Sequence, residues 1–143
     1  MQTRPPLSIL LVEDDEVDVM LVERILSRSN LRYRLVHAAN GLDALDRLRS
    51  RDLGSPLLVL LDLNMPRMGG LEFLRELRAD DALADTAVYV FTTSKRREDI
   101  VESRRLQVTG YLLKDECSTN PQRFTQVLRE FWSRSSGEEA LRL

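Results

Sequence analysis

The sequence predicts an α/β protein with a doubly wound sheet of five parallel strands and helices on both faces. Short apolar runs alternate with segments of helical periodicity five times along the chain, which is typical of repeated strand–helix units. The run at residues 57–61 is apolar throughout, as expected of a parallel strand buried on both faces. A length of 143 residues accommodates five such units in one domain and leaves no room for a second.

The first half of the chain contains three of these strands and two helices. We place the strands at residues 9–12, near 32–37 and at 57–61. The helix after the first strand has one apolar face at helical spacing, formed by Val17, Met20, Leu21 and Ile25. The second helix begins at Gly41, and its inward residues are Ala44, Leu45 and Leu48.

The second half contains strands at residues 87–91 and 108–113 and begins with a helix near Gly69 and Gly70. The inward residues of that helix are Phe73, Leu74 and Leu77. The helix between the last two strands is densely charged, and its apolar anchors are Ile100, Val101 and Leu106. Few buried contacts give low local stability, so this helix is either a moving part or simply an exposed charged helix.

The last helix has clear start signals. Asn120 can cap it, and Pro121 suits its first turn, where a missing N–H costs nothing. Its apolar stripe is formed by Phe124, Val127, Leu128 and Phe131, which Trp132 extends. We therefore expect an arm at residues 1–6, the domain at 7–132 and a frayed tail at 133–143.

Composition excludes several classes of function. A formal net charge of −2 gives no attraction toward nucleic acid or an anionic membrane, and we expect neither as a partner. The single cysteine, Cys117, rules out an intramolecular disulfide, and no signal peptide or membrane-spanning segment is evident, so a cytoplasmic location is expected. The single histidine, His37, excludes a multi-histidine metal site, and we assign it no chemistry.

Polar residues follow four of the predicted strands, and these residues should meet. They are Glu13-Asp14-Asp15, Asp62, Thr92-Thr93-Ser94 and Lys114. In an open parallel sheet the binding crevice lies outside the carboxyl ends of the strands. The sequence therefore predicts that carboxylates, hydroxyls and one ammonium group converge on one site.

This set of side chains predicts chemistry on a phosphoryl group. Clustered carboxylates repel one another unless a cation compensates, and all-oxygen ligation by Glu13, Asp14 and Asp62 suits magnesium. An Asp carboxylate can attack phosphorus, and Asp62 follows the most apolar strand, where placement is most rigid. Lys114 and the Thr93 hydroxyl could bind phosphoryl oxygens. Each residue alone is better explained as an ordinary surface group; the set is not.

At these residues the chain resembles the receiver domains of two-component response regulators. The matching stretches are residues 11–15, 61–66 with the glycines at 69–70, 92–94 and 110–114, and the likeness covers about residues 7–132. More narrowly, the chain is similar to single-domain receivers that partner bacterial phytochromes. The resemblance implies a flavodoxin-like (βα)5 fold with strand order 2-1-3-4-5 and no attached effector domain.

The resemblance also implies a role for each site residue. Asp62 matches the phosphoacceptor; Glu13 and Asp14 match the acidic pair that holds magnesium, and Asn64 matches the position that gives the metal a backbone carbonyl. Lys114 matches the phosphate-binding lysine and Tyr111 the aromatic switch. Thr93 is matched to the hydroxyl switch because Ser94 then takes the small-residue position after it, which leaves Thr92 pointing to the other face of the strand.

The implied function is a signalling switch and not an enzyme with a released product. A histidine kinase, such as a bacteriophytochrome, would transfer a phosphoryl group to Asp62, and the kinase would dock near Glu16, Val17 and Met20. Output would pass through protein contacts at the fourth helix, fifth strand and last helix. A homodimer could form through that face or through Trp132, unless Trp132 instead covers its own chain.

One departure from the family pattern concerns the lysine. Most receivers have a cis proline after it, whereas Asp115 follows Lys114 here. A cis bond before a residue other than proline costs about 3 kcal/mol, so this segment either bears that strain or takes another path.

Two other functions are compatible with parts of the pattern. The first is a magnesium-dependent phosphatase or phosphotransferase with an Asp nucleophile, but such enzymes carry a second acid where this chain has Asn64. The second is a binding module of the same fold that needs no phosphorylation. The intact set of Asp14, Asp62, Thr93 and Lys114 argues against that module.

Overall fold

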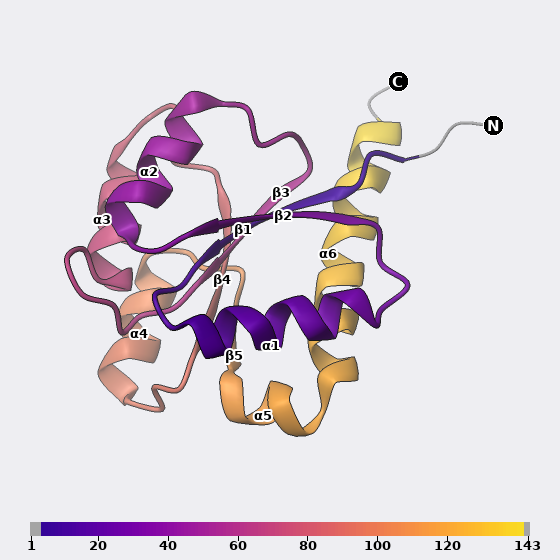
Figure 1. Cartoon of the computed structure of the whole chain (residues 1–143). Coiled ribbons are helices and arrows are strands. Elements are labelled where there is room, and N and C mark those ends of the chain that lie inside the picture. The colour runs from indigo at the N-terminus through magenta and orange to yellow at the C-terminus, as the bar shows by residue number, and fades with distance from the viewer. Residues whose placement is uncertain (1–3, 142–143) are drawn as a thin grey trace.

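Five parallel strands form one sheet in the order β2-β1-β3-β4-β5, which confirms the predicted fold and strand order. The computed structural model describes residues 4–141, with side chains as far as Ser135 (Figure 1). The strands are β1 (Leu7–Val12), β2 (Tyr33–Ala38), β3 (Leu57–Leu61), β4 (Ala87–Thr92) and β5 (Gly110–Leu113). The described chain alternates strand and helix, as the apolar pattern predicts.

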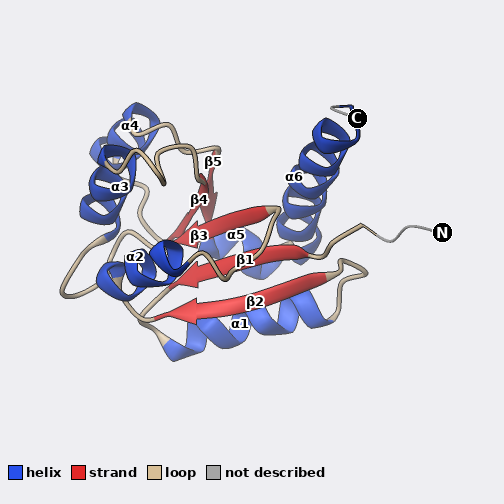
Figure 2. Ribbon diagram, turned by 90° about the horizontal axis from the view of Figure 1, so that it is seen from above, coloured by secondary structure: helices blue, strands red, loops and turns tan. Residues whose placement is uncertain are grey.

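Helices cover both faces of this sheet (Figure 2). They are α1 (Glu16–Ser27), α2 (Gly41–Ser50), α3 (Gly70–Ala79), α4 (Arg97–Arg105), α5 (Lys114–Thr119) and α6 (Pro121–Leu141). One core lies between the sheet and α2 and α3, with the fully buried Phe73 in it. The other core lies between the sheet and α1, α5 and α6, where Phe91 and Phe124 pack edge to face with ring centroids 5.5 Å apart. The two cores hold the central strands in a fixed register.

That register brings the polar strand ends to one edge of the sheet. Val12 pairs with Leu61, and Leu61 pairs with Val90, so Glu13 and Asp62 leave the sheet side by side, while β4 continues for two more residues. Thr92 likewise pairs with Leu113, directly before Lys114. The predicted convergence is therefore a result of strand pairing.

The inward face of α1 differs from the prediction. Its buried residues are Val19, Val22, Ile25 and Leu26. Val17 and Met20 are instead exposed, at 71% and 59% of their surface. Two apolar stripes run along this helix, and the one with the greater number of large aliphatic residues packs on the sheet. The second stripe remains on the surface beside the polar edge.

The C-terminal part contains a helix that the sequence pattern did not predict. The six-residue α5 begins at Lys114, directly after β5, and α6 then begins at Pro121 as predicted. Strand β5 begins at Gly110, two residues later than expected. The helical backbone of α6 continues to Leu141, so the expected frayed tail is part of this helix as far as that residue.

Helix α4 is weakly anchored at its centre, as predicted. Ser103 is its one buried residue, and Val101 is 40% exposed. Its C-terminal end is held from α3 by the guanidinium of Arg78, which donates hydrogen bonds to the carbonyl oxygens of Leu106 (2.7 Å) and Gln107 (3.3 Å). The end of α4 is thus fixed while the middle rests on few side-chain contacts.

Among residues 4–141, no helix has both the length and the apolar character needed to cross a bilayer.

Candidate functional site

Three carboxylates meet at the edge of the sheet, as the sequence predicts. Glu13, Asp14 and Asp62 each offer an oxygen, and these oxygens lie within 4.8 Å of one another. The backbone holds them there: the N–H of Glu13 donates to the carbonyl of Ala38 (3.0 Å), and that of Asp62 donates to the carbonyl of Val12 (3.0 Å). Glu13 and Asp62 are buried, and Asp14 is exposed. The cluster therefore opens to solvent on the side of Asp14.

The electrostatics of this cluster fit a divalent cation. Burial, reinforced by the charge of Asp62, raises the pKa of Glu13 to about 7 despite opposing contacts to Lys114 and to the N–H of Asp15. A buried carboxylate with a raised pKa is one that lacks enough positive charge around it. Oxygen ligands with an open side are what magnesium prefers, so the residues present fit the ion.

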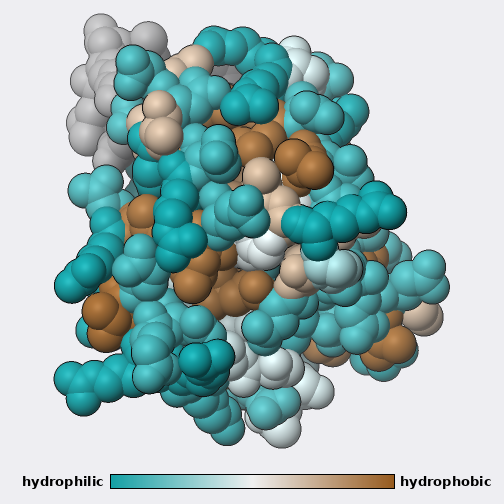
Figure 3. All heavy atoms as spheres, turned by 90° about the vertical axis from the view of Figure 1, so that its left-hand side faces the viewer, coloured by the Kyte–Doolittle hydropathy of each residue, from teal (hydrophilic) through white to brown (hydrophobic). Residues whose placement is uncertain are grey.

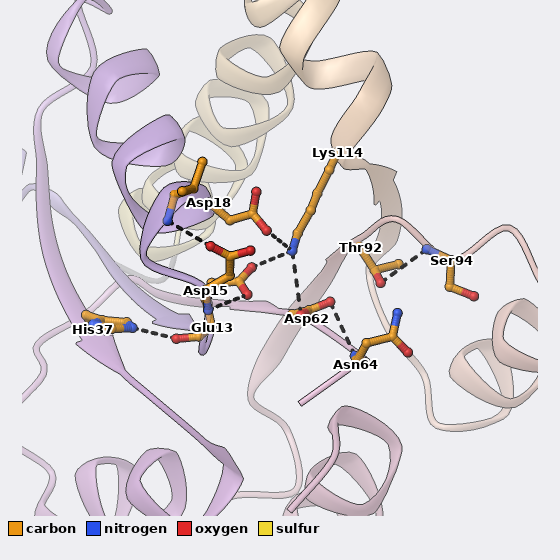
Figure 4. A network of polar contacts seen from close by, with 10 residues as sticks. Glu13, Asp15, Asp18, His37, Asp62, Asn64, Thr92, Ser94 and Lys114 are labelled. Atoms are coloured by element: carbon orange, nitrogen blue, oxygen red, sulfur yellow. Dashed lines mark hydrogen bonds and ion pairs between the residues drawn. The ribbon is translucent and has the colours of Figure 1, made fainter. Parts of the chain in front are cut away.

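Lys114 supplies the cation of the site (Figure 4). Its Nζ lies 2.7 Å from Oε1 of Glu13, 2.6 Å from Oδ2 of Asp18 and 3.6 Å from Oδ2 of Asp62. Burial alone would lower the pKa of Lys114, but hydrogen bonds to Asp18 and Glu13 and the charge of Asp62 raise it. The ammonium group is therefore charged and turned toward the carboxylates.

The chain after Lys114 avoids a strained cis peptide bond. Among residues 4–141 the cis peptide bond is the one between Ser55 and Pro56, so the bond to Asp115 is trans. The chain passes directly from β5 into α5 at Lys114. This lysine consequently lacks the loop constraint that a cis proline would give.

The segment after Asp62 is held close to it. The N–H of Asn64 donates to Oδ1 of Asp62 (3.3 Å), which orients that carboxylate. At the start of α3, a Cβ on Gly70 would lie 2.5 Å from the carbonyl oxygen of Asp62, so only glycine permits this approach. Asn64 itself is exposed at the mouth of the site.

Two adjacent hydroxyls lie at the end of β4 in different surroundings. Thr92 is fully buried, and its Oγ1 accepts a hydrogen bond from the N–H of Ser94 (3.3 Å). Thr93 is exposed and lines a pocket together with Asp18 and Lys114. Thr92 therefore lies at the edge of the core, and Thr93 lies on the exposed rim of the site.

Tyr111 shares a face of the sheet with Thr92. Val90 pairs with Tyr111, and both pack in the core of α2 and α3. Alternation along β4 puts Thr92 on the same face as Val90. The hydroxyl of Tyr111 donates to the carbonyl oxygen of Ser94 (2.8 Å), so the ring is tied to the segment that follows β4.

Asp18 and His37 were not predicted as part of this region, and Asp15, which was, acts as a helix cap. Asp18 contacts Lys114 from the first turn of α1, although the two are 96 positions apart. Asp15 caps α1, with Oδ1 accepting from the N–H of Val17 (2.8 Å). His37 Nε2 lies 2.6 Å from the carbonyl oxygen of Glu13. Asp is a preferred N-cap residue, so the cap at Asp15 could be found from the sequence, but nothing in the sequence pattern pairs Asp18 with a lysine.

Comparison with known proteins gives a family and several relatives. The family model described as the response regulator receiver domain matches residues 9–129. The response regulator Rcp1 of Synechocystis is 34% identical over 135 residues, which cover 92% of each chain.

Solved structures give the same result. That of the phosphorylated cyanobacterial phytochrome response regulator RcpA has a TM-score of 0.75 at 33% identity, covering 87% of this chain and 91% of the other. The Mn(2+)-bound form of Rcp1 has a TM-score of 0.68 at 34% identity, covering 95% and 93%.

Proposed function

The chain belongs to the response regulator receiver domain family, and we propose that Asp62 is its phosphoacceptor. Receivers of this family are the phosphoryl-accepting signalling switches of two-component systems, and their partners are histidine kinases. The observation that carries the proposal is the placement of the buried Asp62 between two further carboxylates and the ammonium of Lys114.

The transfer follows from this geometry. An oxygen of Asp62 attacks the phosphorus of a kinase phosphohistidine, the new O–P bond forms as the N–P bond breaks, and the imidazole nitrogen keeps the electron pair. Lys114 binds a phosphoryl oxygen, and the N–H of Asn64 keeps the carboxylate oriented. Bound by Glu13, Asp14, Asp62 and the carbonyl of Asn64, magnesium would neutralise charge on the phosphoryl oxygens.

Phosphotransfer to the wild type and to Asp62→Asn tests the assignment. We expect the wild type to gain an acid-stable, base-labile label from its kinase, and Asp62→Asn to gain none. Asp46→Asn, which removes an exposed acid on α2, is the matched control and should be labelled like the wild type. Undiminished labelling of Asp62→Asn would refute the proposal.

For the hydroxyl that responds to the phosphoryl group, we propose Thr92 in place of Thr93. The support is that Thr92 is buried on the face of Tyr111, so its movement would open space for that ring, whereas Thr93 lies on the exposed rim. We expect Thr92→Val to uncouple Tyr111 from phosphorylation and Thr93→Val to leave the coupling intact. NMR shifts of the Tyr111 ring with and without phosphodonor distinguish the two, and the reverse result would restore Thr93.

We propose a bacteriophytochrome-type histidine kinase as the first partner to test. RcpA is described as a phytochrome response regulator, and its structure is similar to this one. The exposed Val17 and Met20 beside the acidic cluster offer an apolar patch for a kinase helix. Rapid labelling of Asp62 by such a kinase, lost in Met20→Asp but retained with a small phosphodonor, would support this partner. Equal labelling of Met20→Asp by the kinase would contradict the docking site.

We also propose a homodimer, through the face of α4, β5 and the last helix or through Trp132. The first candidate face, formed by α4, β5 and the last helix, is only partly on the side shown in Figure 3, where α2, α3 and α4 are mostly hydrophilic with separate apolar patches. Trp132, the other candidate, contacts its own chain: Nε1 donates to the carbonyl of Pro5 (3.0 Å), and the Arg4 guanidinium lies 5.2 Å from the ring. Sedimentation with and without phosphodonor decides this point, and a monomer in both conditions would exclude the dimer.

A further inference from the structure

We propose that Asp18 is a positioning residue that holds the ammonium group of Lys114 at the phosphoacceptor. The inference rests on the proposed role of Asp62. In this chain the segment after Lys114 does not restrain the lysine, and the first turn of α1 restrains it instead. Asp18 thereby joins the site without touching the phosphoryl group itself.

The ammonium group of Lys114 lies among three carboxylates and donates its hydrogen bond to Asp18. Its Nζ donates a hydrogen bond to Oδ2 of Asp18 (2.6 Å) and forms an ion pair with Oε1 of Glu13 at 2.7 Å. Asp62 forms a longer ion pair with the same ammonium group, with Oδ2 3.6 Å from Nζ (Figure 4). A lysine side chain has four rotatable bonds, and two fixed acceptors remove most of that freedom before a phosphoryl group arrives.

The backbone around Lys114 does not supply this constraint. The bond to Asp115 is trans, and α5 has no side-chain cap at Leu113. Helix α1, in contrast, is a firm base, because Asp15 caps it and Val19 and Val22 are buried against the sheet. Asp18 therefore presents its carboxylate from the better-anchored of the two elements.

Asp18 also remains available to accept a hydrogen bond from Lys114 when the carboxylate cluster holds a metal ion. Glu13 belongs to the group of carboxylates that fits a divalent cation, and oxygens bound to a metal are weaker acceptors for an ammonium group. Asp18 is outside that group. Lys114 can thus exchange Glu13 for the phosphoryl oxygen while keeping its bond to Asp18.

The surroundings of Asp18 show that it is more than a charge at a helix terminus. Its side chain is 23% exposed and lines, with Lys114, Thr93 and Val17, a pocket of about 400 Å³. Glu16 is equally placed in the first turn of α1 for the helix dipole but is exposed and has no ion pair to Lys114. Glu16→Gln is therefore a control that removes the same charge from the same turn.

The experiment compares Asp18→Asn, Asp18→Glu and Glu16→Gln with the wild type by two measurements. The first is NMR relaxation of the Lys114 Cε group in metal-free protein, which reports how firmly the side chain is held. The second is labelling of Asp62 by acetyl phosphate, a small donor that needs no docking surface. Thermal unfolding checks that each variant folds, and Asp18→Ser takes the place of Asp18→Asn if the latter does not.

We expect Asp18→Asn to increase the motion of Lys114 and to slow labelling by about tenfold, because an ionic hydrogen bond is replaced by a neutral one. Asp18→Glu should restore part of both, and Glu16→Gln should behave as the wild type. If Asp18→Asn matches Glu16→Gln in both measurements, the inference is wrong. If the wild type is not labelled at Asp62, the proposed function fails, while the relaxation data still test the contact.

Discussion

Replacing Glu13 by Gln is expected to stabilise the metal-free protein at alkaline pH. Glu13 is fully buried beside Asp62, and burial raises its pKa from 4.5 to about 7. A carboxyl whose pKa is higher in the folded than in the unfolded state binds more protons when folded between those two values. Its contribution to stability is thus fully present below pH 4.5 and is lost as the pH rises through 7.

The size of the effect follows from that interval. Each pH unit between the two pKa values corresponds to about 1.4 kcal/mol, so ionising Glu13 costs the folded state about 3 kcal/mol at pH 8. Glu13→Gln has no such group, so its advantage over the wild type should be about 3 kcal/mol larger at pH 8 than at pH 4.5. Titrating groups that do not contact Glu13 are common to both proteins and cancel in this difference.

Urea unfolding of both proteins at the two pH values, followed by circular dichroism in the presence of a chelator, measures the difference directly. Magnesium should then stabilise the wild type at pH 8, because it binds the ionised carboxylates of the folded state, and should stabilise Glu13→Gln less. A difference between the two proteins that does not change with pH would refute the reasoning on burial.

Three further substitutions test contacts that stabilise the fold, one of them next to Asp62. Arg78→Met should lower the free energy of unfolding by about 2 kcal/mol in urea titrations, since several backbone carbonyls lose a charged donor; an unchanged midpoint would contradict this. Gly70→Ala should cost about 2 kcal/mol and slow labelling of Asp62, because the added methyl group collides with the Asp62 carbonyl; unaltered labelling would exclude that collision. Trp132→Phe should lower the free energy of unfolding by about 1 kcal/mol in thermal unfolding, because the hydrogen bond to the carbonyl of Pro5 is lost. Unchanged stability would show that this hydrogen bond does not contribute.

The residue pattern alone predicted the parallel sheet and the meeting of Glu13, Asp62 and Lys114, whereas the strand order came from the family resemblance. These predictions succeeded because continuous apolar runs are specific for buried parallel strands, and because the carboxyl ends of such strands lie at one edge by geometry. The position of a polar residue at the end of a run is therefore also its position in space. The position of a residue that directly follows a strand can therefore be predicted from the sequence.

Contacts made by helix side chains were decided only by the tertiary structure. The periodicity of α1 allowed two inward faces. In the folded chain Val19 and Val22 are buried against the sheet, and Val17 and Met20 are exposed. That rotation places Asp18 at Lys114, a contact between residues 96 positions apart that no local pattern encodes. The sequence thus determined which groups reach the edge of the sheet, and packing of the helices determined which of them hold the lysine, because helix rotation depends on surfaces that only the folded chain brings together.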